Sequence, residues 1–312
     1  MSSHVLTALL LISAVSYGQD NLPWRDQSPH RVRFVTVDDG VRLETLDWGG
    51  QGPPLVLLAG YLTAHAYDKF APKLTAFAHV YGITRRGLGA SSRPESGHTA
   101  ERSAEDVLKV LDELKLAAPV LAGHSFGGQD LTTIGANSPE RAAGLIYLNS
   151  AEDPTLKLSD YGVKPPDTDQ RPPATPAADK SSFAAYRRWQ LRNHGVAFPE
   201  SELRQLYAVN PDGTLGDYLV PKSVRDAMAA GLRKPEYTRI RVPVLAFFAV
   251  PRDADDQMNR AIVKRHIQDL RKGVPGARIV ELPGANFYIF LSNEAELVRE
   301  INSFMAEVRQ GR

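Results

Sequence analysis

The residues with the clearest chemical potential are Gly123-His124-Ser125-Phe126-Gly127, which match the pattern Gly-x-Ser-x-Gly. A continuous apolar run ends just before them at Ala122, and a helical sequence begins near Phe126. A serine on a sharp turn between a buried strand and a helix exposes its hydroxyl above the sheet, where it can attack a carbonyl carbon. Glycines suit the flanking positions because a Cβ atom has no room where strand and helix meet. The spacing therefore predicts a sharp turn that exposes the hydroxyl of Ser125.

Two other segments accompany this serine in a recognisable order. Leu57-Leu58-Ala59-Gly60-Tyr61 ends an apolar run, and Arg85-Arg86-Gly87-Leu88-Gly89-Ala90-Ser91 is a polar turn after the next predicted strand. Together with the serine turn, they make the chain resemble the α/β-hydrolase superfamily, in its serine-hydrolase, carboxylesterase-like branch. The resemblance runs from about residue 32 to residue 308. Most relatives have His-Gly where this chain has Ala59-Gly60.

The resemblance implies that Ser125 is the nucleophile of an acyl transfer and that the backbone N–H groups of Phe126 and Tyr61 form the oxyanion hole. The Tyr61 side chain can equally serve only as a wall of the pocket. His124 is expected to pack beneath the strand, because two neighbouring residues cannot both point up from the turn.

The acid of the triad is expected after the apolar run Val242–Val250. Asp253, Asp255 and Asp256 all follow that run, and Asp253 best matches the spacing in relatives. These aspartates can instead cap the next helix, where negative charge is favoured. The other position that relatives use for the acid carries Asn149 here.

The chain departs from the family at the histidine. In relatives this residue follows the last strand, and aligning Ile289-Phe290-Leu291-Ser292 with the family pattern puts Phe287 at its position. A register shifted by one puts Asn286 there, and no histidine occurs beyond His266. Phenylalanine can neither accept the serine proton nor return one to the leaving group.

Three other histidines could substitute for the missing base: His65, His98 and His194. Each is expected to be a surface or supporting residue. The sequence therefore leaves three interpretations open: an impaired hydrolase, a non-catalytic pseudoenzyme that binds a small molecule, or an intact hydrolase with one isolated substitution. The expected partner in each is a small-molecule substrate or ligand, and the resemblance implies an ester.

No cofactor or metal motif competes with this interpretation. The chain has no cysteine, and its eight histidines show no His-Glu-x-x-His or paired spacing. No Gly-x-Gly-x-x-Gly or P-loop pattern is present. The sequence predicts neither a metal site nor a cofactor.

Predicted elements position these residues. A hairpin around Asp39-Gly40 precedes strands and helices that alternate through residue 150, including a helix over 65–77. This alternation predicts a mostly parallel sheet flanked by helices. Residues 151–238 break the pattern and are interpreted as a helical cap insertion between core segments 19–150 and 239–312.

Composition narrows the possible partners and compartments. The 312 residues include 37 Lys and Arg and 36 Asp and Glu, a balance that argues against nucleic acid as a partner. The apolar run Val5–Val15 and the small residues after it predict a signal peptide over residues 1–18. The mature chain is then expected to be periplasmic or secreted and to have no stable membrane span.

Overall fold

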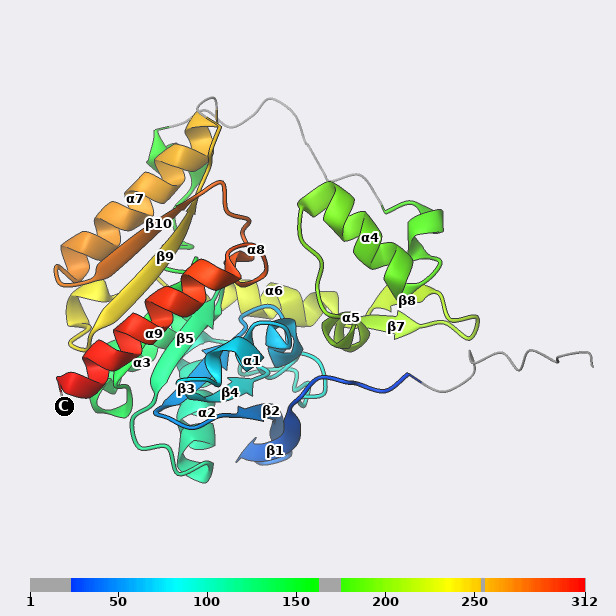
Figure 1. Ribbon diagram of the computed structural model, residues 1–312, viewed down its shortest axis with the longest axis horizontal. Coiled ribbons are helices and arrows are strands. Elements are labelled where there is room, and N and C mark those ends of the chain that lie inside the picture. The colour runs from blue at the N-terminus through cyan, green and yellow to red at the C-terminus, as the bar shows by residue number, and fades with distance from the viewer. Residues whose placement is uncertain (1–23, 163–174, 254–255, 312) are drawn as a thin grey trace, which may run out of the picture.

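A twisted eight-stranded sheet lies at the centre of the computed structural model, which describes residues 24–162, 175–253 and 256–311 (Figure 1). The strand order is β1-β2-β4-β3-β5-β6-β9-β10. β2 pairs antiparallel with both β1 and β4, whereas all later pairs are parallel. The strands are β1 (Arg31–Asp38), β2 (Val41–Gly49), β3 (Pro54–Leu58), β4 (His79–Ile83), β5 (Val120–His124), β6 (Gly144–Leu148), β9 (Val244–Val250) and β10 (Arg278–Pro283).

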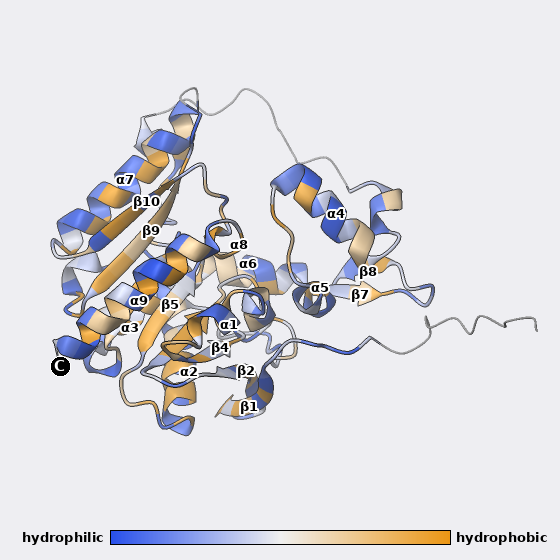
Figure 2. Cartoon of the chain, in the orientation of Figure 1, coloured by the Kyte–Doolittle hydropathy of each residue, from blue (hydrophilic) through white to orange (hydrophobic). Residues whose placement is uncertain are grey.

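The central strands are apolar along their whole length because both of their faces are covered. In β3, Leu55 and Leu57 belong to one hydrophobic core, and Val56 and Leu58 belong to the other. Successive strand side chains point to opposite faces, so a run without polar residues supplies both cores. Figure 2 shows this as orange colouring along β5 and β9, whereas the outer helices carry both colours.

Helices cover the two faces of the sheet. One core is closed by α2 (Ala100–Glu113), α3 (Gly127–Asn137) and α7 (Gln257–Gly273). The other is closed by α1 (Ala71–Leu74), α8 (Ile289–Ser292) and α9 (Glu294–Gln310). The predicted α/β-hydrolase fold, with a mostly parallel sheet flanked by helices, is confirmed.

The prediction of a single helix over residues 65–77 is wrong. The chain forms a 3₁₀ turn, η1 (Ala64–Tyr67), and then the short α1, which has Pro72 in its first turn. Proline has no backbone N–H and is best tolerated at the start of a helix, so a new helix begins there. η1 also fixes the side chains of His65 and Asp68 at its end, a point that matters below.

The insertion after β6 folds over the carboxyl ends of the central strands, on the right of Figure 1. Its Leu203 and Leu206 join the same core as Leu57. The sequence did not predict the small hairpin or the last α-helix of this insertion. Its elements are η3 (Leu158–Tyr161), η4 (Ala177–Lys180), α4 (Phe183–His194), α5 (Glu200–Leu206), β7 (Tyr207–Val209), β8 (Leu215–Tyr218), α6 (Lys222–Ala230) and η5 (Tyr237–Arg239).

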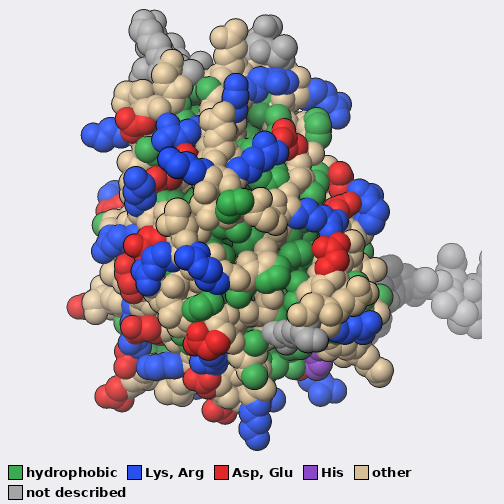
Figure 3. All heavy atoms as spheres, turned by 90° about the vertical axis from the view of Figure 1, so that its left-hand side faces the viewer, with side chains coloured by type: hydrophobic (Ala, Val, Ile, Leu, Met, Phe, Trp, Pro, Cys, Tyr) green, Lys and Arg blue, Asp and Glu red, His purple; other side chains and the backbone are tan. Residues whose placement is uncertain are grey.

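The surface carries charges of both signs. Figure 3 shows basic and acidic side chains interspersed over the face that lies on the left of Figure 1. Within the described residues, none of the helices is long and apolar enough to cross a bilayer. The predicted signal peptide, residues 1–18, lies outside the described part of the chain.

A buried ion pair fixes the polar turn after β4 to helix α2. Nε and Nη2 of Arg86 donate to the two carboxylate oxygens of Asp106 at 2.6 and 2.7 Å. Both side chains are almost completely buried. Such bidentate geometry compensates the desolvation of the two charges, but neither charge is stable there alone.

We therefore expect Asp106→Ala to lower the free energy of unfolding by about 3–5 kcal/mol, because it leaves the Arg86 guanidinium buried without a counter-charge. Asp112→Ala is the matched control, since Asp112 pairs with Arg141 at the surface, and it should cost less than about 1 kcal/mol. Urea unfolding measures both. Equal losses would contradict the assigned role of the buried pair.

Candidate active site

Ser125 lies in the turn between β5 and α3, and its backbone adopts a positive φ of 52°. The turn is possible because backbones approach closely on both sides of it. A Cβ atom on Gly123 would lie 2.6 Å from the carbonyl carbon of Gly127, and one on Gly127 would lie 2.4 Å from the carbonyl oxygen of Leu58. Only glycine fits these positions, so β3, β5 and α3 converge beneath the serine.

The loop after β3 runs directly beside the serine turn. Gly60 has a φ of +70°, and a Cβ atom there would lie 2.8 Å from the backbone nitrogen of Phe126. The next residue, Tyr61, places its ring 5.1 Å from the Phe126 ring in an edge-to-face contact. The two residues that the resemblance assigns to an oxyanion hole are thus neighbours at the same side of Ser125.

Arg85 also holds the serine turn. Its Nη2 donates to the carbonyl oxygen of Phe126 at 3.1 Å and to Oδ2 of Asp130, on α3, at 2.6 Å. The guanidinium therefore ties the end of β4 to the first turn of α3. Arg85 acts on the position of the turn and touches none of the reacting groups.

A cavity of about 490 Å³ opens at Ser125 under the cap insertion. Aromatic and aliphatic side chains make most of its wall, and none of the lining residues is Lys, Arg, Asp or Glu. The lining residues are Ala59, Tyr61, Leu62, His124, Ser125, Tyr186, Gln190, His194, Val196, Phe198, Leu203, Leu206, Tyr207, Tyr218, Phe287 and Tyr288. Such a wall suits an uncharged, mainly apolar molecule.

Phe287 lines this cavity together with Ser125. The alternative register is different: Asn286 turns to the cap insertion, where its Nδ2 donates to the carbonyl oxygen of His194 at 2.7 Å. Residue 287 is therefore the one of the two that faces the serine. Its ring is a hydrocarbon, and no hydrogen bond joins Ser125 Oγ to a histidine in the described part of the chain.

His124 is buried, as the sequence predicts. Its ring lies 4.8 Å from the ring of Phe287 and 5.1 Å from that of Phe290, and its Nε2 lies 3.2 Å from the carbonyl oxygen of Phe287. Burial lowers the pKa of His124 to about 4, although the Phe287 carbonyl opposes this. A base must become protonated when it accepts the serine proton, so this environment makes His124 a weak base.

Of the three substitute histidines, only His194 reaches the cavity. Its ring packs edge-to-face on Trp189 at 4.9 Å. Burial alone would lower the pKa of His65, but hydrogen bonds from its ring to the carboxylates of Asp68 and Glu44 raise the pKa to about 10, so both ring nitrogens are engaged. His98 is buried against the carbonyl oxygen of Pro94 at 3.0 Å.

Asp253 and Asp256 do not line the Ser125 cavity. Asp253 is exposed, and its carbonyl oxygen accepts from Nε of Arg260 at 3.1 Å. Asp256 caps α7 by accepting from the backbone of Asn259 at 3.2 Å, which is the capping role considered above. Asp255 lies outside the described residues.

Asn149, at the other position used for the acid, contacts the histidine position directly. Its Nδ2 donates to the carbonyl oxygen of Phe287 at 3.3 Å, and its Oδ1 accepts from the backbone of Ala249 at 2.9 Å. Like Ser125, Asn149 has a positive φ, of 54°. The end of β6 therefore presents an amide to the backbone of residue 287.

Sequence reasoning also missed a group of metal-ligating side chains. Asp26, His30, His65 and Asp68 come together although no motif unites them. These residues come from two segments that are distant in the sequence, so no spacing within one segment indicates the whole group. The D-x-x-x-H spacing of the first pair and the H-x-x-D spacing of the second were the only sequence signals.

Comparison with known proteins places the chain among hydrolases. The profile of the alpha/beta hydrolase family matches residues 55–300. A non-heme chloroperoxidase of Streptomyces lividans is 33% identical over 131 residues, 40% of this chain and 47% of that protein, so the chain spans about half the length of this relative. The pimeloyl-acyl-carrier-protein methyl ester esterase of Vibrio campbellii is 25% identical over 279 residues, 84% of this chain and 95% of that protein.

A solved structure agrees in fold. The crystal structure of E-2-(acetamidomethylene)succinate hydrolase superposes with a TM-score of 0.68 at 18% sequence identity, covering 89% of this chain and 99% of that one. At this identity the similarity concerns the fold alone.

The close approach of the backbones beneath Ser125 predicts that a glycine-to-alanine substitution there lowers the free energy of unfolding. Replacing glycine by alanine inside a helix normally stabilises it by about 0.5–1 kcal/mol, but we expect Gly127→Ala to destabilise the protein by about 1–3 kcal/mol because its Cβ meets the Leu58 carbonyl. Gly276→Ala is the control, since nothing lies within 4 Å of that Cβ. Urea unfolding of the two variants compares them, and a stabilised Gly127→Ala variant would show that β3 and α3 are not so close.

Proposed function

The chain belongs to the alpha/beta hydrolase family, and from this premise we propose that it is a serine hydrolase of the carboxylesterase type whose general-base step is severely weakened. Ser125 is the nucleophile in this proposal. The backbone N–H groups of Phe126 and Tyr61 stabilise the oxyanion, and Phe287 takes the place of the base. Small uncharged esters are the substrates.

The backbone of Ser125 carries this proposal. A non-glycine residue held at positive φ costs about 1–3 kcal/mol and persists only where its surroundings enforce it. Here three close approaches at glycines enforce it, and the strained residue is the one whose hydroxyl faces the cavity. A turn that served only to connect β5 with α3 would have no need of this strain.

The substrate class follows from the cavity wall. Without a charged lining residue, the cavity offers no partner to a carboxylate or an ammonium group, and burying an unpaired charge is costly. An ester with an apolar acyl group fits this wall. The methyl ester esterase among the relatives acts, by its name, on an ester as well.

Acylation and deacylation each require two proton transfers, one from the nucleophile (the Ser125 hydroxyl, then water) and one to the leaving group (the alcohol, then Ser125 Oγ), and Phe287 can perform none of them. Ser125 Oγ attacks the ester carbonyl while its proton leaves, the alcohol departs with a proton, and water then cleaves the acyl-serine. Without an imidazole at residue 287, solvent must accept and supply these protons. Loss of the base in a triad costs up to about 10⁶ in kcat, while the oxyanion hole and binding retain roughly 10³–10⁴ over water.

A second function is favoured by one observation, the exposure of Phe287. Its side chain is 44% exposed and extends the aromatic wall of the cavity beside Tyr288. An apolar ring in place of the base enlarges the surface that a small apolar or aromatic ligand can contact. In this alternative the protein binds such a ligand and does not convert it.

Phe287→His should restore the base and raise kcat/KM for p-nitrophenyl butyrate by at least about 10²-fold over the parent chain. Ser125→Ala in the same background should abolish the gain. Fluorophosphonate labelling, followed by mass spectrometry, should proceed faster at Ser125 in Phe287→His than in the parent.

Two controls make the result decisive. His194→Gln in the parent should change residual hydrolysis by less than about tenfold, because His194 belongs to the cavity wall but is not the base. A fast, Ser125-dependent parent that loses its activity in His194→Gln would refute the weakened-base proposal. A variant Phe287→His that neither labels nor turns over would instead favour the ligand-binding function.

The position of the acid can be decided in the Phe287→His background. Adding Asn149→Asp should raise kcat by about tenfold or more, because a carboxylate at residue 149 can orient the new imidazole and stabilise its charge. Asp253→Asn in the same background is the comparison, and it should change kcat little. A large loss in Asp253→Asn, with no gain from Asn149→Asp, would place the acid after β9 instead.

A further inference from the structure

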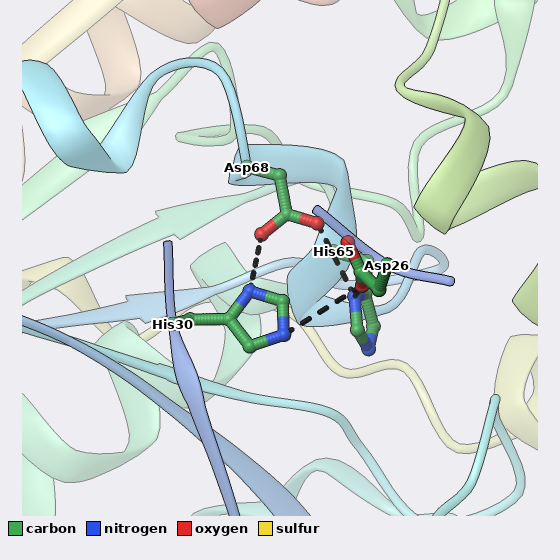
Figure 4. A group of neighbouring side chains, drawn as sticks. All are labelled: Asp26, His30, His65 and Asp68. Carbon is green, nitrogen blue, oxygen red and sulfur yellow. Dashed lines mark hydrogen bonds and ion pairs between the residues drawn. The ribbon is translucent and has the colours of Figure 1, made fainter. Parts of the chain in front are cut away.

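Four side chains from two distant segments converge beside the edge of the sheet, away from the Ser125 cavity (Figure 4). Asp26 and His30 belong to the segment that leads into β1, and His65 and Asp68 belong to η1 and its end. One ligand atom from each of them lies within 4.8 Å of all the others. His30, His65 and Asp68 are well buried, whereas Asp26 closes the group from the outside.

Three of the separations are close to those around a tetrahedral metal ion. Nδ1 of His65 lies 3.4 Å from Oδ2 of Asp26 and 3.2 Å from Oδ2 of Asp68, and Nε2 of His30 lies 3.7 Å from Oδ2 of Asp26. Zinc bonds to nitrogen and oxygen of about 2.0–2.2 Å give tetrahedral edges of about 3.3–3.6 Å. To join the same ion, the His30 ring would have to exchange its hydrogen bond from Nδ1 to Asp68 for a bond to the metal.

The imidazole of His65 is held in the orientation that metal binding needs. Its Nε2 lies 3.3 Å from a carboxylate oxygen of Glu44. Metal-ligating histidines usually donate their second ring nitrogen to a carboxylate in this way. The other nitrogen, Nδ1 of His65, then faces the carboxylates of Asp26 and Asp68.

Asp68 is fixed by neighbours from two other parts of the chain. Trp48 Nε1 donates to its Oδ1 at 3.2 Å, and Ser201 Oγ, from the cap insertion, donates to its Oδ2 at 2.6 Å. A carboxylate with this support loses little freedom when it binds a metal. Asp68 and His65 are therefore already held in place, and His30 is the ligand that must turn.

We propose that Asp26, His30, His65 and Asp68 bind a structural zinc ion. Two imidazoles and two carboxylates suit zinc, whereas calcium and magnesium prefer ligand sets of oxygen alone. The two carboxylates also balance the charge of a divalent ion. Four protein ligands leave no open position for substrate, and none of the four lines the Ser125 cavity, so the role is structural.

The ion would join three parts of the molecule. It links the segment before β1 to η1, and through Ser201 it reaches the cap insertion. η1 begins three residues after Tyr61. Zinc therefore stabilises the base of the loop that carries Tyr61, together with the contact of the cap insertion on that loop.

The competing explanation is a metal-free ionic cluster in which protonated histidines balance the same carboxylates. The test uses the full chain, purified with a histidine-free tag and stripped with a chelator. Elemental analysis after addition of zinc and gel filtration should find one zinc per chain. At a zinc concentration about 100 times Kd, the melting temperature should rise by about 5–10 °C.

Variants identify the ligands. Asp26→Asn and His30→Gln should each lower zinc affinity at least about tenfold and remove most of the zinc-dependent rise in melting temperature. His79→Gln is the matched control, because His79 pairs with Asp47 at 2.8 Å on the same sheet but outside the group, and it should bind zinc like the parent.

Cobalt gives a readout that does not depend on how well the variants fold. Cobalt(II) added to the stripped parent chain should give the visible absorption of a tetrahedral site, and zinc should displace it. No bound zinc in the parent, an octahedral cobalt spectrum, or equal zinc affinity in His30→Gln and His79→Gln would each overturn the proposal in favour of the ionic cluster.

Discussion

The convergence of three backbones beneath Ser125 is the constraint on which the rest of the site depends. Gly60, Gly123 and Gly127 have no space for a Cβ atom, so the loop after β3, strand β5 and helix α3 lie as close as peptide chains can. This closeness forces Ser125 into positive φ and brings the amide of Phe126 beside the loop that carries Tyr61. Nucleophile and oxyanion donors are therefore consequences of one packing arrangement.

That arrangement is independent of the side chain at residue 287. The loop after β10 is held by its backbone: the carbonyl oxygen of Phe287 lies within hydrogen-bond distance of His124 and Asn149, and the side chain of Asn286 holds the carbonyl of His194. None of these contacts needs an imidazole. The fold around Ser125 can therefore persist without a catalytic base. An intact serine turn is compatible with very slow hydrolysis.

The sequence predicts what depends on local pattern and misses what depends on convergence. Buried strands can be predicted because a strand that is covered on both faces needs an apolar run. The serine turn can be predicted because its glycines lie close to the serine in sequence. The acid is not readable in this way, because Asp253, Asp256 and Asn149 follow strands equally well, and only the fold shows that Asn149 contacts residue 287. The group at Asp26 was missed for the same reason.

The segment from Tyr61 to Asp68 connects features that otherwise look separate. Glu202 of the cap insertion is fully buried and accepts from both the backbone N–H and the hydroxyl of Thr63. Two residues on, His65 begins the contacts with Glu44 and Asp68. A buried carboxylate is tolerated only where such donors satisfy it. The cap insertion is thus anchored by polar contacts to the same stretch, residues 61–68, that positions Tyr61. An interaction that stabilises this stretch therefore also stabilises the position of the cap insertion over Ser125.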